Sequence, residues 1–195
     1  SVTSAGSLTS AQLATLEGFT TGAITVTVSD ESQSATSLIA LDADASEAVN
    51  ASTISTLTGS AEDVNTVYDS DGITGLGDEA VTLSDTSISA SVLTTVDGNT
   101  TGTVDASTVT SITGTVAEAN TLYASSGISG GGNEAVTISD TTISATALNT
   151  LDGNTTGTVD ASSLKTITGT GADAKTAFDS AGITLTFDAS SYLAG

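Results

Sequence analysis

The sequence contains no cysteine, histidine, proline, methionine or tryptophan, and only 3% of its 195 residues are aromatic. Without histidine or cysteine, the common nucleophile–base pairs, zinc sites and iron–sulfur sites are excluded. The metals that remain are hard cations that prefer oxygen ligands, such as calcium. Hydrophobic residues make up 37% of the chain and are almost all Val, Ile, Leu or Ala, so we expect a thin and regular core.

Basic residues are nearly absent as well. Two lysines, Lys165 and Lys175, stand against 23 acidic residues, and the formal net charge is -21 at pH 7. Because contacts to phosphate require Lys or Arg, nucleic acid and anionic lipid head groups are excluded as direct partners. No apolar run approaches the ~20 residues of a membrane-spanning helix, so membrane insertion is not expected. Such an acidic surface suits a salty medium, which screens charges beyond about 8 to 10 Å.

What the sequence does contain is a repeat. Three near-copies of one stretch occupy residues 47–59, 102–114 and 157–169, at a constant offset of 55 in residue number. A period in this range is typical of stacked repeat arrays. We therefore interpret residues 1–195 as a single array. Its expected parts are a partial N-terminal unit at 1–25, repeats at 26–80, 81–135 and 136–190, and the start of an incomplete turn at 191–195.

A weaker half-period divides each repeat. Residues 13–24 resemble residues 148–159 at an offset of 135, which is twice 55 plus 25. This offset predicts turns whose lengths alternate between 25 and 30 and that stack along one axis. Strands are then expected to start near a regular series of positions: Ile24, Val49, Glu79, Val104, Glu134, Val159 and Leu185.

Each turn reads as a short strand followed by a short helix. Strand segments such as 81–84 are rich in β-branched residues with a period of two. Helix starts carry capping signatures, in which a Ser or Thr is followed three residues later by an acidic residue: Ser60 with Asp63, Thr115 with Glu118, and Thr170 with Asp173. These patterns favour an α/β solenoid with a parallel sheet. A parallel β-helix is the alternative, because such short helices are marginal alone.

Recurrent aspartates are the candidates for metal binding. Most are expected to be solvated or to cap turns, because like carboxylates two turns apart are roughly 10 Å from each other, too far to share one calcium ion. Two local clusters are weak calcium candidates: Asp69, Asp71, Asp78 and Glu79, and Asp42, Asp44 and Glu47. Neither matches an established calcium-binding repeat.

Other features that suggest a site have simpler explanations. Tyr68, Tyr123 and Phe178 share one position in successive repeats, where core packing is expected over an aromatic binding stripe. Lys165 has serine neighbours, but the copies place Ser55 and Thr110 at its position, so the repeat does not maintain a Ser–Lys pair. Without aromatic platforms or a break in repeat symmetry, neither an enzyme nor a small-molecule substrate is expected. No cofactor other than calcium is indicated.

Three motifs carry a resemblance to known proteins. They are V-D-A-S-x-hydrophobic-x-x-I-T-G-T at 104–115, V-T-hydrophobic-S-D at 81–85, and L-D-G-N-T-T-G at 151–157. Together they resemble the tandem repeats of very large bacterial surface and extracellular proteins, especially marine and cyanobacterial ones. Such proteins include type I-secreted adhesins and surface-layer or filament components, often calcium-responsive. The resemblance implies an extracellular or cell-surface location.

These observations predict a structural protein. We expect a segment or subunit of a surface fibre, sheath, surface layer or adhesin stalk that acts through stacking and self-association. Neither terminus resembles a polar cap, and residues 187–193 read as a strand that is not completed, so the expected partner is a second copy, end to end. The alternative is a ligand-binding module for calcium, glycan or ice.

Overall fold

The computed structural model describes residues 2–3 and 26–186. The strand start predicted at Ile24, the unfinished strand at 187–193 and the incomplete turn at 191–195 lie outside the described residues, as does nearly all of the partial unit at 1–25. The chain divides into two compact units, of which unit 1 comprises Ser1–Ser84 with Thr95–Asp105 and unit 2 comprises Asp85–Thr94 with Ala106–Gly195.

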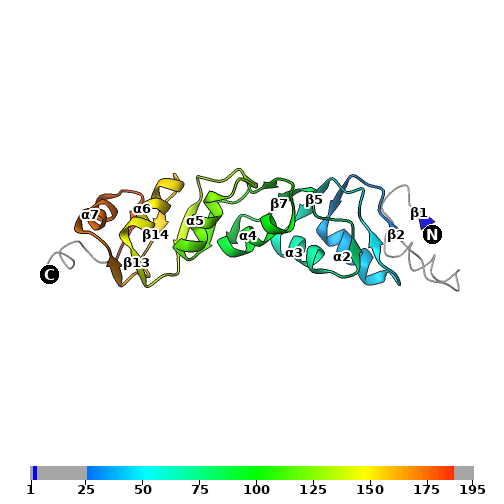
Figure 1. Cartoon of the computed structure of the whole chain (residues 1–195), viewed down its shortest axis with the longest axis horizontal. Helices are drawn as coiled ribbons and strands as arrows, with labels where there is room; N and C mark the ends of the chain where they lie inside the picture. The colour runs from blue at the N-terminus through cyan, green and yellow to red at the C-terminus, as the bar shows by residue number, and fades with distance from the viewer. Residues whose placement is uncertain (1, 4–25, 187–195) are drawn as a thin grey trace. The chain divides into compact units, whose positions relative to one another are not determined.

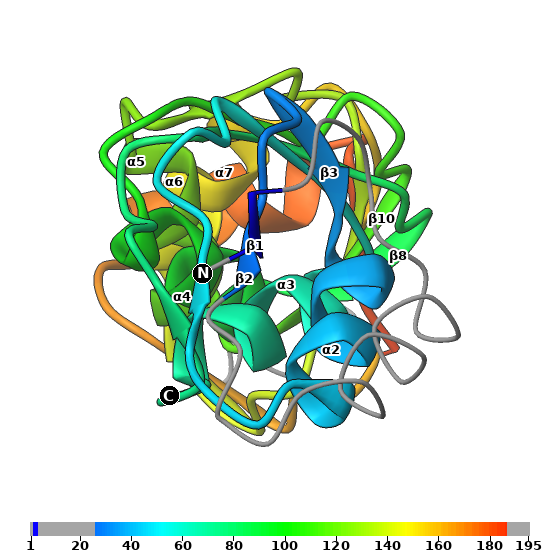
Figure 2. The same cartoon turned by 90° about the vertical axis from the view of Figure 1, so that its right-hand side faces the viewer.

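Helices and strands alternate along the described chain (Figure 1). Its six helices are α2 (Ala35–Asp44), α3 (Ala61–Asp69), α4 (Ala90–Asn99), α5 (Val116–Ala124), α6 (Ala145–Asn154) and α7 (Gly171–Asp179). In unit 1, α2 packs against α3, as Figure 2 also shows. In unit 2, α6 packs against both α5 and α7. Helices of nine or ten residues favour the α/β prediction over the parallel β-helix.

The predicted helix caps are confirmed. The side chains of Ser60, Thr115 and Thr170 each accept a hydrogen bond from the backbone N–H three residues on. At α5 the capping box is complete, because Glu118 also accepts from the backbone N–H of Thr115 at 2.7 Å. These bonds hold the pKa of the Glu118 carboxyl below its usual range. Each cap satisfies amide groups that the first helical turn leaves open.

The strands of unit 1 form parallel ladders in two sheets. One sheet runs in the order β1 (Val2–Thr3), β2 (Val26–Thr27), β4 (Val49–Asn50) and β6 (Ile73–Thr74). In the other, the strands of this unit follow the order β3 (Ser32–Ser34), β5 (Thr56–Gly59), β7 (Ala80–Leu83) and β9 (Val104–Asp105).

Unit 2 repeats this arrangement. A five-stranded parallel sheet has the order β8 (Ser87–Ser89), β10 (Ser111–Gly114), β12 (Ala135–Ile138), β14 (Val159–Asp160) and β16 (Ile183–Thr184). A second sheet pairs β13 (Thr142–Ser144) with β15 (Thr166–Thr168). The remaining strand of this unit, β11 (Ile128–Ser129), belongs to neither of these two sheets. The predicted strand starts at Val49, Glu79, Val104, Glu134 and Val159 are correct to within one residue, whereas Leu185 follows β16 instead of opening a strand.

The pairing register corrects the predicted turn length. Val26 pairs with Val49, an offset of 23 in residue number, and Val49 pairs with Ile73, an offset of 24. In unit 2, Ile112 pairs with Val136 at the same offset of 24. The strands therefore return at an offset of 23 or 24, and the predicted turn lengths of 25 and 30 are wrong.

The positions at which the helices start, in contrast, do alternate in spacing, close to the predicted 25 and 30. The first residues of α2, α3 and α4 are Ala35, Ala61 and Ala90, so the helix starts advance by 26 (61 − 35) and then by 29 (90 − 61). The repeat offset of 55 exceeds the two strand offsets together by 8 (55 − 23 − 24). Equivalent positions of successive repeats consequently fall in different sheets. Val49, Val104 and Val159 belong to β4, β9 and β14, one in each of three sheets, so the prediction that these three valines align along one axis is wrong.

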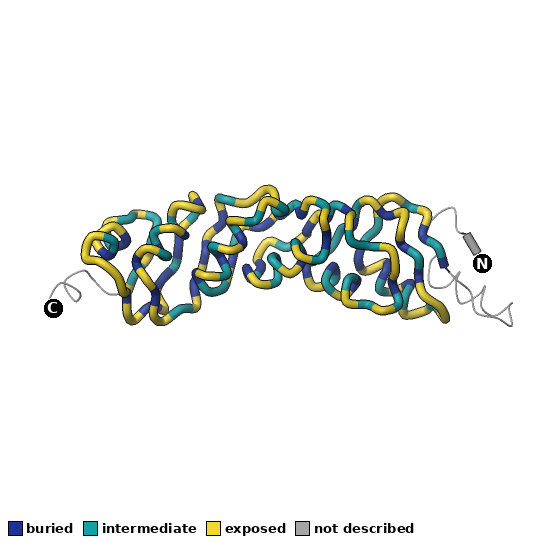
Figure 3. The backbone as a smooth tube through the Cα atoms, viewed as in Figure 1, coloured by how far each residue is buried: buried dark blue, intermediate teal, exposed yellow. Residues whose placement is uncertain are grey.

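Aliphatic side chains form the core within each unit. Between Val49 and Gly72, the buried residues larger than alanine are Val49, Ile54, Leu57, Val64 and Val67. Buried positions recur at short intervals along the tube in Figure 3. Each such side chain contributes about 1.5–3 kcal/mol of burial free energy before conformational entropy is subtracted. No helix in the described part of the chain is long and apolar enough to cross a membrane.

Candidate functional site

Two glycine-rich loops hold the most buried charged side chains. Residues 74–79 connect β6 to β7 in unit 1, and residues 129–134 connect β11 to β12 in unit 2. Each loop ends in a glutamate, Glu79 or Glu134, with relative exposures of 0% and 1%. A carboxylate this deeply buried is costly unless several donors compensate for the lost water. The two loops that hold these buried carboxylates are therefore the candidate functional sites.

In both loops the carboxylate accepts hydrogen bonds from the loop itself and from the preceding helix. Oε2 of Glu134 receives the backbone N–H groups of Gly132 (2.8 Å) and Asn133 (3.1 Å) and the hydroxyl of Tyr123 (3.0 Å). Glu79 receives the equivalent groups, the N–H groups of Gly77 and Asp78 and the hydroxyl of Tyr68. The glutamate thus fixes the loop to the last turn of α5 or α3.

The two tyrosines remain protonated. Burial raises the pKa of the Tyr123 hydroxyl above its ordinary value of 10, and the negative charge of Glu134 raises it further. At Tyr68, burial is again the largest cause of the raised pKa, followed by the hydrogen bond to Glu79. A hydroxyl in this state donates a hydrogen bond and does not act as a base near neutral pH. Each tyrosine hydroxyl therefore serves as a hydrogen-bond donor to its glutamate.

The turn after the next helix closes over each glutamate from the other side. Thr155 follows α6, is buried, and donates its hydroxyl to the carbonyl oxygen of Glu134 at 2.7 Å. The N–H of Gly157 donates in turn to the Thr155 hydroxyl at 3.0 Å. In unit 1, Thr100 and Gly102 make the same bonds above Glu79. A β carbon on either glycine would collide with the glutamate carbonyl group, so only glycine fits there.

The residues predicted as calcium candidates are dispersed or already engaged. Asp42 accepts from the hydroxyl of Ser70 at 2.7 Å, and Glu79 is occupied as described above. The others lie at helix ends or in exposed loops: Asp44, Glu47, Asp69, Asp71 and Asp78. Over residues 26–186, no three Asp or Glu side chains form a group that could hold a metal ion. Calcium binding stays a prediction.

Two of the recurrent aspartates act as caps, one at a helix start and one in a turn. Asp140 Oδ2 accepts from the N–H of Val116, the first residue of α5, at 2.8 Å. Asp160 Oδ1 accepts from the N–H of Ser162 at 3.0 Å, and its hydrogen bonds to Ser162 lower the pKa of the Asp160 carboxyl. Asp140 thus caps the N-terminus of α5, and Asp160 closes a local turn.

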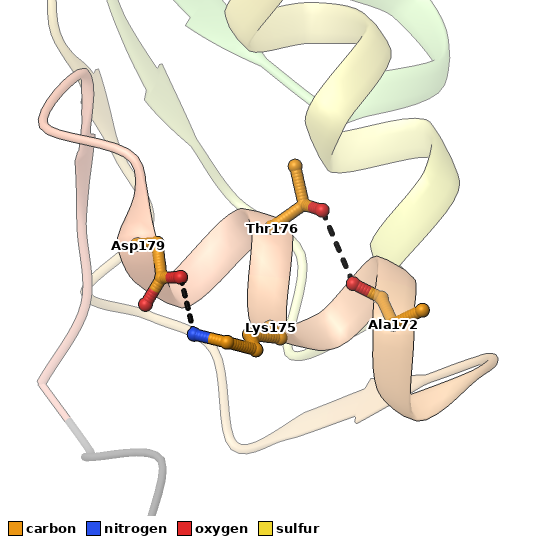
Figure 4. Close-up of polar contacts among 4 residues, drawn as sticks. All are labelled: Ala172, Lys175, Thr176 and Asp179. Atoms are coloured by element: carbon orange, nitrogen blue, oxygen red, sulfur yellow. Dashed lines mark hydrogen bonds and ion pairs between the residues drawn. The ribbon is translucent and has the colours of Figure 1, made fainter.

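The exposed lysine of α7 forms a surface ion pair. Lys175 lies 2.5 Å from Asp179 one helical turn on, with side-chain exposures of 73% and 63% (Figure 4). Lys165 is exposed as well. Neither lysine contributes to the buried loops.

Sequence reasoning missed the tyrosine hydroxyls and Glu134, although the sequence carries a signal for them. Tyr68 precedes Glu79 by 11 residues, and Tyr123 precedes Glu134 by the same number. In the third copy both partners change together, since Phe178 stands at the tyrosine position and Ala189 at the glutamate position. The hydroxyl and the carboxylate are therefore present or absent as a pair. The core prediction for the aromatic position holds only in part, because Tyr68, Tyr123 and Phe178 are half-buried.

The loops differ at three positions, Thr74/Ser129, Leu76/Gly131 and Asp78/Asn133, and the change from Leu76 to Gly131 alters the size of the side chain most. Leu76 is half-buried in the 74–79 loop, whereas Gly131 stands at the equivalent position of the 129–134 loop. Beside Gly131 lies a pocket of about 220 Å³, lined by Leu122, Tyr123, Ser125, Ile128, Gly130, Gly131, Gly132 and Asn154.

Comparison of the chain with protein-family models, curated proteins and solved structures found no match.

Proposed function

We propose that the chain is a structural repeat protein, a segment or subunit of an extracellular or cell-surface array. Its turns, in which paired strands are offset by 23 or 24, would stack as an α/β solenoid. The observation that carries the proposal is the parallel register within each unit, in which strand after strand pairs at the same short offset. Stacked repeats gain stability from their neighbours and extend without a change of design.

The buried polar groups support a structural role. Glu79 and Glu134 bind their own loops, and Thr100 and Thr155 bind the glutamate carbonyls. In the described part of the chain, every fully buried side-chain nitrogen or oxygen has a hydrogen-bond partner. Groups used in this way fix the conformation of loops and strands. A catalytic site would instead require a base or nucleophile held ready for a substrate.

The charge and the motifs support a location outside the cell. With a net charge of -21, copies repel one another at low ionic strength, whereas salt reduces the Debye length to about 8 Å at 0.15 M. Self-association is therefore expected to strengthen as salt is added. The tandem repeats that the motifs resemble belong to bacterial surface proteins.

A lengthened chain tests the solenoid. A second copy of residues 81–135 inserted after residue 135 adds about 2.3 turns, since paired strands are offset by 23 or 24. At about 4.8 Å per parallel strand, small-angle X-ray scattering should record an increase of roughly 11 Å in maximum dimension. The cross-sectional radius of gyration should stay the same. An increase in cross-section without added length would overturn the solenoid.

Light scattering across a concentration series tests self-association. We expect the mass to rise with protein concentration in 0.5 M NaCl, and filaments or rods to be visible by electron microscopy. A matched series with calcium chloride at equal ionic strength separates calcium-specific assembly from screening. A monomer at every concentration and salt would refute assembly and leave the solenoid untouched.

A further inference from the structure

Lys165 is an exposed lysine without a partner among the described residues. The chain has two basic residues against 23 acidic ones, and Lys175 is already held by Asp179 within α7 (Figure 4). The ammonium group of Lys165 forms no ion pair or hydrogen bond with any described residue. It also departs from the repeat, because Ser55 and Thr110 stand at its position in the other copies. A free ammonium group on so acidic a chain is a candidate contact for another copy.

A second departure from the repeat is an open groove between α4 and α5. The groove has a volume of about 320 Å³, lies within unit 2 and is lined by Ser91, Thr94, Ala117, Glu118 and Thr121. Its exposed lining is mostly apolar. The hydroxyls of Thr94 and Thr121 donate to carbonyl oxygens one turn back in their own helices, both at 2.8 Å. A chain of methylene groups can pack on such a surface.

The other repeats place larger side chains at the position of Thr94. Ile39 is the equivalent residue in the first repeat and Asn149 in the third. The side-chain amide of Asn149 donates to the carbonyl oxygen of Asp173 at 3.0 Å and so bridges α6 and α7. Thr94 is shorter, and its hydroxyl bonds to its own helix, which leaves the space between α4 and α5 open.

Glu118 is the charged residue in the lining of this groove. Its Oε2 accepts from both the N–H (2.7 Å) and the hydroxyl (2.9 Å) of Thr115, and no described residue donates to its Oε1. The carboxyl is open to solvent, so a cation can reach it. The groove therefore combines an apolar wall with an accessible carboxylate. A lysine side chain, four methylene groups that end in an ammonium, has the matching chemistry.

We propose that the Lys165 side chain of a second copy docks in this groove. Its methylene stem packs against the α4 and α5 side chains that line the groove, and its ammonium donates a hydrogen bond to Oε1 of Glu118. This inference rests on the proposed self-association and names the residues that make the contact. Copies with a net charge of -21 repel one another, so we expect them to meet where a cation of one faces a carboxylate of the other. The apolar packing matters as well, because an exposed ion pair alone contributes little.

Zero-length crosslinking tests the contact directly. An equal mixture of nitrogen-15-labelled and unlabelled protein in 0.5 M NaCl would be treated with a water-soluble carbodiimide, which joins a lysine to a carboxylate in contact with it as an amide. Mass spectrometry should find a mixed-isotope pair that joins Lys165 to Glu118. The Lys175–Asp179 pair is the internal control and should carry one isotope only. Crosslinks of Lys165 mainly to other acidic residues, or only within one copy, would overturn the groove as its binding site.

Two lysine variants separate this contact from general electrostatics. Lys165→Thr and Lys175→Asn each install the residue of the second repeat, and each removes one positive charge. By light scattering in 0.5 M NaCl, Lys165→Thr should weaken self-association at least fivefold, whereas Lys175→Asn should stay within about twofold of the parent. Association that the two variants affect equally, or not at all, would refute the contact and leave the proposed self-association standing. A parent that is monomeric at every concentration would refute both.

Variants of the groove test the other side of the contact. Thr94→Ile fills the groove with the side chain that Ile39 provides in the first repeat, and Glu118→Gln removes the charge but keeps a residue suited to the capping box. Each should weaken association at least fivefold with an unchanged helical circular dichroism signal. Asp173→Asn removes the same charge at the same helix position of the third repeat and should leave association unchanged. Association of Thr94→Ile as tight as that of the parent would show that Lys165 docks elsewhere.

Discussion

Gly157 is the position where a single methyl group should do the most damage. It follows α6 in the turn that closes over Glu134, and its own N–H donates to the Thr155 hydroxyl. A β carbon there would collide with the carbonyl oxygen and carbon of Glu134 and lie 2.8 Å from the nitrogen of Ala135. All three atoms are backbone, so no side-chain rotation relieves the clash. Gly157→Ala must therefore displace either the turn or the start of β12.

The cost can be estimated from the bonds at stake. Overpacking of a closed site costs about 1–3 kcal/mol. A displaced turn also weakens the Thr155–Glu134 hydrogen bond, which contributes about 0.5–1.5 kcal/mol. We expect Gly157→Ala to lower the free energy of unfolding by about 2–4 kcal/mol. For a chain of this length that corresponds to a fall in Tm of roughly 4–16 °C.

The same substitution four residues earlier should have the opposite sign. Gly153 lies within α6, and a β carbon there meets nothing within 4 Å. Alanine in place of glycine in a helix stabilises by up to about 1 kcal/mol. Gly153→Ala should therefore raise Tm slightly. Gly98 and Gly102 are the equivalent positions in the other copy. A β carbon on Gly98 would meet nothing within 4 Å, whereas one on Gly102 would collide with the Glu79 carbonyl group.

Thermal melts of the four variants by circular dichroism decide the matter. Gly102→Ala and Gly157→Ala should both melt well below the parent, and Gly98→Ala and Gly153→Ala at or above it. If all four melt within about 1 °C of one another, well inside the shift expected for a chain of this length, the proposed contact between the turn and the glutamate carbonyl is wrong.

Further changes test separate contacts by chemical or thermal denaturation. Tyr123→Phe removes the hydroxyl from Glu134 and should cost about 1–3 kcal/mol, whereas Phe178→Tyr should bring no gain. Because folding raises the pKa of Tyr123, the stability that its protonated hydroxyl contributes is fully present below pH 10 and is lost as the pH rises above that value. A free energy of unfolding that stays constant between pH 9 and 12 would contradict this. Leu148→Ala, at a position with 0% exposure, should cost about 2–5 kcal/mol. Lys175→Ala should change stability by no more than about 0.5 kcal/mol, because its ion pair with Asp179 is exposed.

Local features of the fold could be predicted from the sequence because their causes are local. The caps at Ser60, Thr115 and Thr170 depend on residues three positions apart, and the sequence displays both partners. Strand starts such as Val104 follow from β-branched residues next to turn-forming ones. Each feature is set by a few neighbouring side chains, so its position can be found without knowledge of the tertiary structure.

The turn length could not be predicted in the same way. Sequence similarity reports which segments have the same local structure, and the helix starts do recur at alternating offsets, from Ala35 to Ala61 and then to Ala90. Strand pairing is decided by which inward residues meet, and Ile112 meets Val136 at an offset of 24. The repeat offset of 55 residues is longer than two strand offsets of 23 or 24, and this difference can be recognised only once the paired strands are known. A similar limit applies to Glu134, because burial of a carboxylate depends on donors such as Tyr123, from a helix that ends well before it in the sequence.

The mismatch between repeat and turn explains how one loop can diverge while the architecture persists. Equivalent strands such as β5 and β10 belong to different sheets, so copies of a loop need not match one another in order to stack. Each loop must retain only its glutamate, its tyrosine and the backbone donors that hold the carboxylate, and both described loops do so. The side chain at the centre of the loop is then free to change, from Leu76 to Gly131. A structural array of this kind can vary the surface of one copy without loss of the hydrogen bonds that build the other.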